Sequence, residues 1–195
     1  MSSCVLIGAR GSGKTKVGKE LAGMLSVPFI DADVLFCEQQ GLTIADFVAQ
    51  NGWPAFREEE TSLLARLYAT HIHHRIVLAA GGGAVAHDQG DAYRMRNRAT
   101  VRAFGTVIYL LPHSDLRKSA EILVRRQQED PLSASMRPAL QAGAQEADPV
   151  EAMYAQLKQR DPLYADAACC TILTRDLVPR QIAQVIAEKY YSHGS

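Results

Sequence analysis

The sequence has no excess of charge of either sign. Its 195 residues include 21 Lys and Arg and 21 Asp and Glu, so the formal net charge at pH 7 is zero. Proteins that bind nucleic acid or membrane surfaces without sequence preference rely on a basic excess. We therefore expect neither nucleic acid nor a membrane among the partners of this chain.

Long apolar runs and cysteine pairs are missing as well. No stretch approaches the roughly 20 apolar residues of a membrane span, and no basic segment followed by an apolar core opens the chain as in a signal peptide. The four cysteines, Cys4, Cys37, Cys169 and Cys170, include no Cys-x-x-Cys pair, which disfavours a metal site built from them. We expect reduced thiols in a cytoplasmic protein. With no obvious apolar stripe, we also expect a monomer.

The chain has the composition of a globular protein, with 47% apolar and 22% charged residues. Its length suits a single domain with its own core, predicted over residues 1–195. Strand-like and helix-like stretches alternate, which indicates a five-stranded parallel sheet covered by helices on both faces, a three-layer α/β/α fold. The predicted strands are 4–7, 27–30, 75–80, 106–111 and 168–173. The predicted helices are 14–25, 42–49, 54–70, the second half of 90–104, 114–126 with Ser114 as its N-cap, 150–160 and 178–190.

The first predicted strand leads into Gly-Ala-Arg-Gly-Ser-Gly-Lys-Thr at residues 8–15, which fits the phosphate-binding loop pattern G-x-x-x-x-G-K-[ST]. The glycines let several backbone N–H groups converge on one phosphate, and the following helix presents the positive end of its dipole there. Lys14 can reach the terminal phosphates, and the Thr15 hydroxyl can ligate Mg²⁺. Because strand, loop and helix follow in the required order, we prefer a nucleotide site to a chance glycine-rich turn.

Polar residues follow the second and third predicted strands. Asp31 and Asp33 come after strand 27–30, at the edge of the sheet where open α/β folds bind ligands. Asp33 could equally cap the next helix. The glycines at 81–83 permit close approach of a ligand to the backbone, or form a flexible loop. Arg57 lies in a first helical turn, where the dipole disfavours a cation, and it is either an anion ligand or a surface ion-pair partner of the glutamates that follow it.

Residues 127–149 change character, with few large apolar side chains. A loop of this length inside a compact domain is often a lid, and phosphoryl transfer requires that water be excluded from the site. We therefore predict a lid at about 126–145. The cluster of His71, His73 and His74 has no acidic or thiol partner at ligand spacing, so we favour an exposed turn over a metal site.

The later motifs, taken in order, resemble the shikimate kinase family of P-loop kinases over about residues 4–173. They are Asp31-x-Asp33, Gly52-x-x-x-Phe56-Arg57, Gly81-Gly82-Gly83, Asn97-Arg98, Arg137-Pro138 and Arg160-x-Pro162-Leu163-Tyr164. The resemblance implies ATP-dependent phosphorylation of the 3-hydroxyl of shikimate with Mg²⁺ as cofactor, giving shikimate 3-phosphate and ADP. This reaction is a step in the biosynthesis of chorismate and the aromatic amino acids.

The resemblance also implies a role for each matching residue. Shikimate would be held within a helical segment at about 33–70 and by residues beyond it. Asp33 would bind the ring hydroxyls and help take up the proton of the attacking hydroxyl, while Lys14 and Arg137 would stabilise the transferred phosphoryl group. The ATP ligands would be Gly11, Ser12, Gly13, Lys14, Thr15, Lys16, Arg126 and Arg137, with Arg126 facing the adenine. The shikimate ligands would be Asp33, Arg57, Gly81, Gly82, Gly83 and Arg160. The Mg²⁺ ligands would be Thr15 and Asp31.

Three departures from the family pattern are visible. The lid reads Arg137-Pro138-Ala139-Leu140 where the family usually has Leu in third place, Ala80 stands where Thr is common, and residues 84–96 are longer than usual and have no assigned role. None removes a residue that the chemistry needs. The alternatives are a related small-molecule kinase of the gluconate type, and a catalytically silent module that binds nucleotide as a regulator. A silent module should lack Lys14, Asp33 or one of the arginines of the motifs, and this chain has all of these residues.

Overall fold

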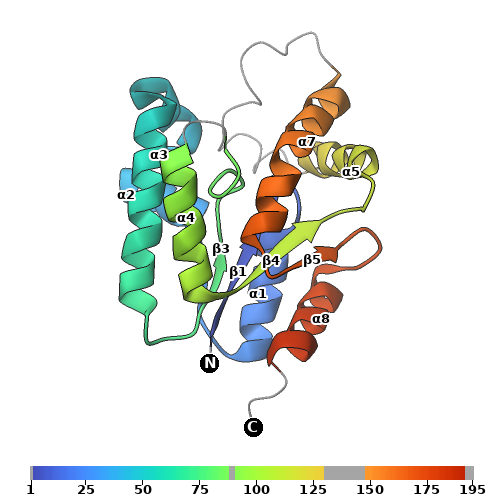
Figure 1. The fold of residues 1–195 in the computed structure, drawn as a ribbon, viewed down its shortest axis with the longest axis horizontal. Coiled ribbons are helices and arrows are strands. Elements are labelled where there is room, and N and C mark those ends of the chain that lie inside the picture. The colour runs from blue at the N-terminus through green and yellow to red at the C-terminus, as the bar shows by residue number, and fades with distance from the viewer. Residues whose placement is uncertain (1, 88–90, 130–147, 192–195) are drawn as a thin grey trace.

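The computed structural model describes residues 2–87, 91–129 and 148–191. Its centre is a five-stranded sheet in the order β2-β3-β1-β4-β5, and every neighbouring pair is parallel. The strands are β1 (Ser3–Ile7), β2 (Phe29–Asp31), β3 (Val77–Ala79), β4 (Gly105–Leu111) and β5 (Cys170–Leu173). The helices are α1 (Lys14–Leu25), α2 (Ala32–Gln40), α3 (Ile44–His71), α4 (Asp91–Phe104), α5 (Leu116–Gln128), α7 (Pro149–Ala167) and α8 (Pro179–Tyr191). The predicted α/β fold with a five-stranded parallel sheet is confirmed (Figure 1).

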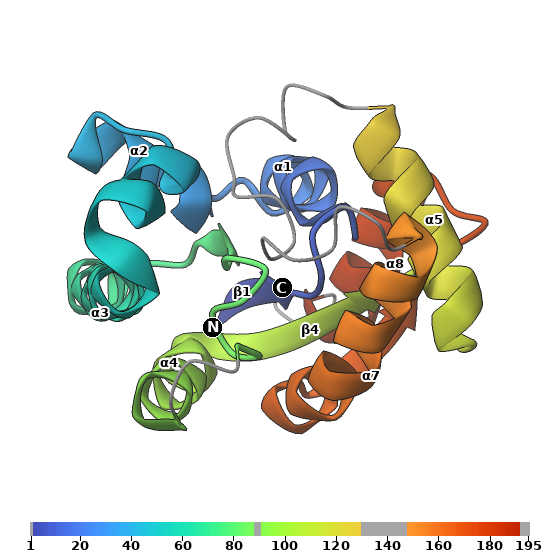
Figure 2. The same ribbon diagram turned by 90° about the horizontal axis from the view of Figure 1, so that it is seen from above.

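Helices cover both faces of the sheet because alternate strand residues point to opposite sides. In β1, Cys4 and Leu6 belong to the core beneath α1 and α8, whereas Val5 and Ile7 belong to the core shared with α3, α4 and α7. Figure 2 shows this layering, with α1 and α8 on one side of β1 and β4, and α4 and α7 on the other. Among the described residues, no helix is long and apolar enough to cross a membrane.

Two helix caps differ from the sequence-based prediction. Asp31, not Asp33, is the N-cap of α2, and its Oδ1 accepts hydrogen bonds from the N–H groups of Asp33 at 3.1 Å and Val34 at 3.4 Å. Asp115, not Ser114, caps α5 by accepting from two backbone N–H groups. In both cases the carboxylate serves two donors, which satisfies more of the exposed helix end than one hydroxyl could. The first difference matters for the site, because it shows that capping α2 is not the role of the Asp33 carboxylate.

Three helices are longer than predicted. The predicted helices 42–49 and 54–70 form one run, α3, with a kink at Gly52, whose φ of 80° and ψ of 166° are not helical. The helix predicted to stop near Arg160 continues through Pro162 to Ala167. Pro162 is exposed, so water can satisfy the carbonyl that loses its partner, while Tyr164 and Ala167 anchor the added turns in the core. Helix α4 likewise covers 91–104 rather than only the second half of 90–104.

The parallel strands bring their carboxyl ends to one edge of the sheet, which points upward in Figure 1. The phosphate loop follows β1 there, Asp31 ends β2, and the glycines at 81–83 come shortly after β3. This is the edge at which open α/β folds bind their ligands. Motifs that are far apart in the sequence are thus collected in one place.

Candidate functional site

Lys14 is held inside the phosphate loop by the loop itself. Its Nζ donates hydrogen bonds to the carbonyls of Gly8 at 2.8 Å and Ala9 at 3.1 Å, and only 7% of the residue is exposed. Gly8 has a φ of 140°, and a Cβ there would lie 2.6 Å from the carbonyl oxygen of Leu110, so no other residue fits that turn. The ammonium group is therefore fixed at the start of α1, where the helix dipole also favours an anion.

Thr15 and Asp31 place two oxygen ligands side by side. The Thr15 hydroxyl donates to Asp31 Oδ2 at 2.6 Å, while the other carboxylate oxygen caps α2. A hydroxyl beside one carboxylate suits Mg²⁺, which is usually held by one or two protein carboxylates, waters and the phosphates of a substrate. The predicted metal ligands thus fit the ion. The described part of the chain contains no group of three His, Cys, Asp or Glu that could hold a metal ion, and so offers none around His71, His73 and His74.

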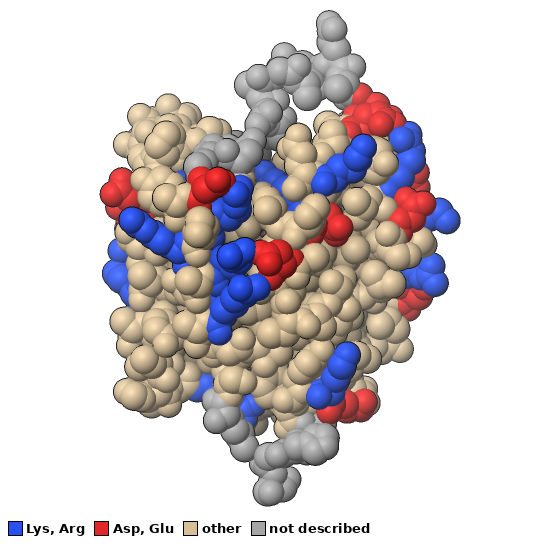
Figure 3. Space-filling model, in the orientation of Figure 1, with Lys and Arg blue, Asp and Glu red and all other residues tan. Residues whose placement is uncertain are grey.

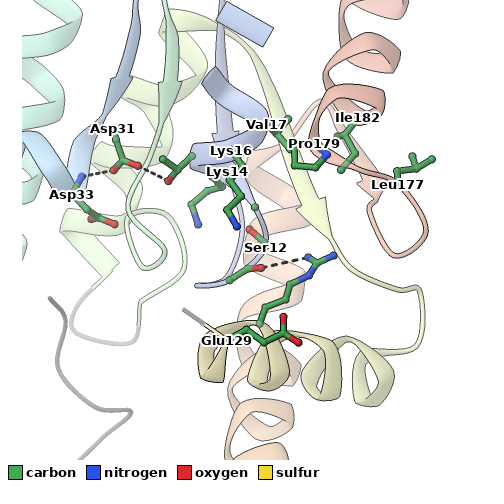
Figure 4. A pocket seen from close by; sticks show the side chains of 14 residues that line it. Ser12, Lys14, Lys16, Val17, Asp31, Asp33, Glu129, Leu177, Pro179 and Ile182 are labelled. Carbon is green, nitrogen blue, oxygen red and sulfur yellow. Dashed lines mark hydrogen bonds between the residues drawn. The ribbon is translucent and has the colours of Figure 1, made fainter. Parts of the chain in front are cut away.

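A cavity of about 440 Å³ opens over the phosphate loop. Figure 4 shows Asp31 and Asp33 on one side of it, Ser12, Lys14 and Lys16 in the middle, and Leu177, Pro179 and Ile182 on the other side. All residues predicted to bind ATP line this cavity, except Arg137, which lies outside the described residues.

Arg126 reaches the cavity from α5, and one of its guanidinium nitrogens lies 3.4 Å from the Gly11 carbonyl oxygen, to which it donates. Burial, together with the charge of Arg125, lowers the pKa of Arg126 below its ordinary value. The apolar wall opposite was not predicted. Pro179 opens α8, as proline commonly opens helices, but nothing in the sequence says that this helix start faces the phosphate loop.

Arg57 and Glu60 form a buried ion pair near the same edge of the sheet. Arg57 Nη1 lies 2.7 Å from Glu60 Oε2, with 3% of Arg57 and 5% of Glu60 exposed. The guanidinium also lies 5.2 Å from the ring centre of Trp53 and 5.0 Å from that of Phe56. The alternative of a surface ion pair is therefore wrong. The sequence left Glu60 as one of three possible partners of Arg57 and did not assign it to the site, because its place in an acidic first turn was explained by the helix dipole alone.

The turn at 81–83 fits tightly against charged side chains. A Cβ on Gly81 would lie 2.7 Å from a Glu60 oxygen and 2.8 Å from an Asp33 oxygen, and one on Gly83 would lie 2.7 Å from an Arg57 nitrogen. Hydrogen bonds from Ala84 N to Gly81 O and from Ala86 N to Gly83 O close the turn, each at 3.0 Å. These contacts argue against a flexible loop.

Arg160 approaches this group from α7. Its charge acts on Glu60 and on the hydroxyl of Tyr164, one helical turn later. Burial raises the pKa of Glu60; the charge of Arg57 opposes this rise, and the charge of Asp33 adds to it. Two arginines and two carboxylates thus gather around a glycine turn, in an arrangement that can bind a planar anion next to hydroxyl groups.

Asp33 joins the two halves of the site. It lines the cavity over the phosphate loop together with Lys14 and Thr15, and it also stands next to Gly81 and Glu60. A phosphate donor in the cavity and a hydroxylated anion at Arg57 would therefore meet at this carboxylate.

The replacement Gly83→Ala tests the tight fit. The added Cβ must displace the guanidinium of Arg57, which is already fixed by Glu60. Overpacking typically costs about 1–3 kcal/mol, and about 1.4 kcal/mol of binding free energy corresponds to a tenfold change, so the KM for the anionic substrate should rise about tenfold while the KM for the nucleotide stays constant. Steady-state kinetics measures both. Gly23→Ala is the matched control, since a Cβ there has no neighbour within 4 Å; equal KM values in the two variants would contradict the fit.

Comparison with known proteins gives one consistent result. The family model described as shikimate kinase matches residues 10–191. A shikimate kinase of Syntrophus aciditrophicus is 37% identical over 192 residues, covering 96% of this chain and 90% of the relative. A shikimate kinase 2 of Dickeya chrysanthemi is 41% identical over 163 residues, covering 84% of this chain and 82% of the relative. The solved shikimate kinase of Acinetobacter baumannii, in complex with shikimate, has a TM-score of 0.79 and 32% identity, covering 96% of this chain and 92% of that one.

Proposed function

Because the chain belongs to the shikimate kinase family, we propose that it transfers the terminal phosphoryl group of ATP to the 3-hydroxyl of shikimate, giving shikimate 3-phosphate and ADP. The observation that carries this proposal is the position of Asp33, which lies between the cavity over the phosphate loop and the buried Arg57–Glu60 pair. One half of the site suits a nucleotide. The other half suits an anion that carries hydroxyl groups.

On the donor side, the loop amides and Lys14 bind the phosphates of ATP. The transferred group spreads its charge over its oxygens, so positioning and cationic stabilisation supply most of the catalysis. Thr15 and Asp31 hold Mg²⁺, which neutralises phosphate charge when bound. Arg126 contributes a guanidinium beside Gly11, and Leu177 and Pro179 supply an apolar wall for the base.

On the acceptor side, Arg57 and Arg160 bind the carboxylate of shikimate. Arginine suits this task because its planar donors match a carboxylate and its charge persists at every working pH. Gly82 approaches the substrate through its backbone, between Gly81 and Gly83. Asp33 accepts a hydrogen bond from the 3-hydroxyl and takes up its proton as the phosphoryl group arrives.

The proposal also covers the domain organisation, the lid, the localisation and the oligomeric state of the protein. Residues 1–195 form one domain, in which 33–70 hold shikimate and 126–145 act as a lid that brings Arg137 over the phosphates. Residues 126–128 of this lid belong to α5, and 130–147 lie outside the described residues. The protein acts in the cytoplasm as a monomer. In support, none of the four cysteines, all of which lie within the described residues, forms a disulfide, and both halves of the site come from one chain.

A coupled ADP-release assay with ATP and Mg²⁺ tests the function. Shikimate should support ADP release, and gluconate and quinate should not. Asp33→Asn should lower kcat about 10²–10⁴-fold, the usual contribution of a positioned base. Asp91→Asn is the matched control, because the Asp91 side chain is 78% exposed and pairs with Arg94. Preferred turnover of gluconate would support the related kinase instead, and nucleotide binding without turnover of any acceptor would support the silent module.

A further inference from the structure

The hydroxyl of Tyr164 links the predicted carboxylate site to the glycine turn. It donates a hydrogen bond to the carbonyl of Gly82, and the charge of Arg160 acts on the same hydroxyl. Tyr164 is completely buried. The hydroxyl therefore contacts a backbone group assigned to shikimate and lies within the influence of an arginine assigned to the same substrate.

Gly82 in turn packs against the phosphate loop. A Cβ on Gly82 would lie 3.4 Å from the backbone nitrogen of Arg10 and 3.7 Å from the carbonyl oxygen of Gly8. Its neighbour Gly83 faces Arg57 on the acceptor side. The carbonyl that Tyr164 holds thus belongs to the short segment that touches both the donor loop and the acceptor arginine.

The ring of Tyr164 is itself fixed. It stacks on Tyr109 with a centroid distance of 4.9 Å, and the Tyr109 hydroxyl donates to Asp161 Oδ1 at 3.0 Å. Farther along α7, Arg98 pairs with Asp166, and Arg102 donates to the backbone carbonyls of Asp166 and Ala167. In Figure 3, basic side chains gather over α4 and meet acidic ones toward α7. The part of α7 that carries Tyr164 is therefore held by contacts with two neighbouring elements, β4 and α4.

A second contact holds the other end of the turn. Asn97 on α4 is completely buried and donates from Nδ2 to the Ala84 carbonyl at 2.9 Å. The carbonyls of residues 82 and 84 are thus held from two helices, α7 and α4. Burial also raises the pKa of Tyr164, although the charge of Arg160 opposes that rise, so the hydroxyl keeps the proton that it donates.

We propose that Tyr164 is a positioning residue for the acceptor. Its hydroxyl holds the glycine turn in the position where Gly82 packs against the phosphate loop and where Arg57 and Arg160 can bind one carboxylate. This inference rests on the proposed function. It assigns to Tyr164 a role in shikimate affinity through Gly82 and Arg160, without contact with the reacting atoms.

The variant Tyr164→Phe removes only the hydroxyl. A net hydrogen bond typically changes an equilibrium about fivefold, so the KM for shikimate should rise about fivefold, while the KM for ATP should stay within about twofold of wild type. Tyr191→Phe is the matched control, because the Tyr191 hydroxyl also donates to a backbone carbonyl, that of Ser3, at 3.2 Å and at the other end of β1. Both variants should lose similar thermal stability, and Tyr191→Phe should keep both KM values.

Introducing 4-aminophenylalanine at position 164 restores a donor and should return the KM for shikimate to within about twofold of wild type. Equal shikimate KM values in Tyr164→Phe and wild type would overturn the inference. It would also be overturned if the Phe variant failed to fold while the 4-aminophenylalanine variant folded, since the hydrogen bond would then serve folding rather than affinity. These outcomes are read against a wild type that turns over shikimate; a wild type that does not would refute the proposed function itself.

Discussion

Lys14→Ala is expected to lower kcat about 10²–10³-fold, the effect of removing one preorganised donor from a developing charge. The ammonium group is buried and fixed by the carbonyls of Gly8 and Ala9, so its position requires little reorganisation when a nucleotide binds. Lys16 also lines the cavity, but it is exposed whereas Lys14 is buried, so we do not expect it to replace the ammonium group of Lys14. Steady-state kinetics with saturating ATP and shikimate measures the loss.

Lys19→Ala is the control for this variant. Lys19 lies on the same helix, is exposed, and loses the same charge. It should retain the kcat of wild type. A Lys14→Ala enzyme with kcat within about threefold of the Lys19→Ala enzyme would show that the loop lysine does not stabilise the transferred group.

Arg57→Ala is expected to lower kcat/KM for shikimate about 10–150-fold, because a hydrogen bond to a charged group contributes about 1.5–3 kcal/mol. The only tryptophan of the chain, Trp53, lies 5.2 Å from the guanidinium. Its fluorescence therefore offers a direct measure of shikimate binding, independent of turnover. Arg66→Ala on the same helix is the control, since Arg66 is exposed and bonds only Gln39 among the contacts described for it.

The same variant should also lose stability, because it leaves Glu60 buried without its cation. Breaking a buried ion pair in this way costs about 3–5 kcal/mol of unfolding free energy. The pKa of Glu60 is already raised by burial, and loss of Arg57 raises it further. The folded state then holds a proton that the unfolded chain releases, so stability is retained below the ordinary pKa of a carboxyl group and is lost as the pH rises through the folded pKa.

The double variant Arg57→Ala/Glu60→Gln separates stability from binding. It should recover most of the unfolding free energy and remove the additional pH dependence, because position 60 then carries no charge that is left without a partner. It should not recover shikimate affinity. Thermal unfolding at pH 5 and pH 8 measures the first effect, and Trp53 fluorescence measures the second. Restored affinity in the double variant would mean that Arg57 acts through Glu60 rather than on the substrate.

Much of the fold could be predicted because its signals are local. The glycine pattern at residues 8–15 requires a strand before it and a helix after it, and both are present as β1 and α1. Helix caps were less predictable. Asp31 and Asp33 are two residues apart at a helix start, and only the backbone geometry of β2 decides that Asp31 accepts the N–H bonds. The continuation of α7 through Pro162 likewise depends on anchoring by Tyr164 and Ala167 in the core.

The parts of the site that were missed depend on contacts between distant segments. Glu60 was visible as an acidic residue, but its burial follows from packing of α3 against the glycine turn. The partner of the Tyr164 hydroxyl lies 82 residues away along the chain. The wall formed by Leu177 and Pro179 reaches the phosphate loop only because α8 packs beside α1. No periodicity or motif within one segment carries such information.

The identity of the phosphorylated product tests the arrangement of donor and acceptor most directly. Wild-type protein with ATP, Mg²⁺ and shikimate should yield one new phosphate ester, and proton–phosphorus NMR coupling should place the phosphorus on the oxygen at ring position 3. This result would require that Asp33 bring that hydroxyl to the phosphate held by Lys14. A phosphate on another hydroxyl, or ADP release with no shikimate ester, would contradict the arrangement of donor and acceptor around Asp33.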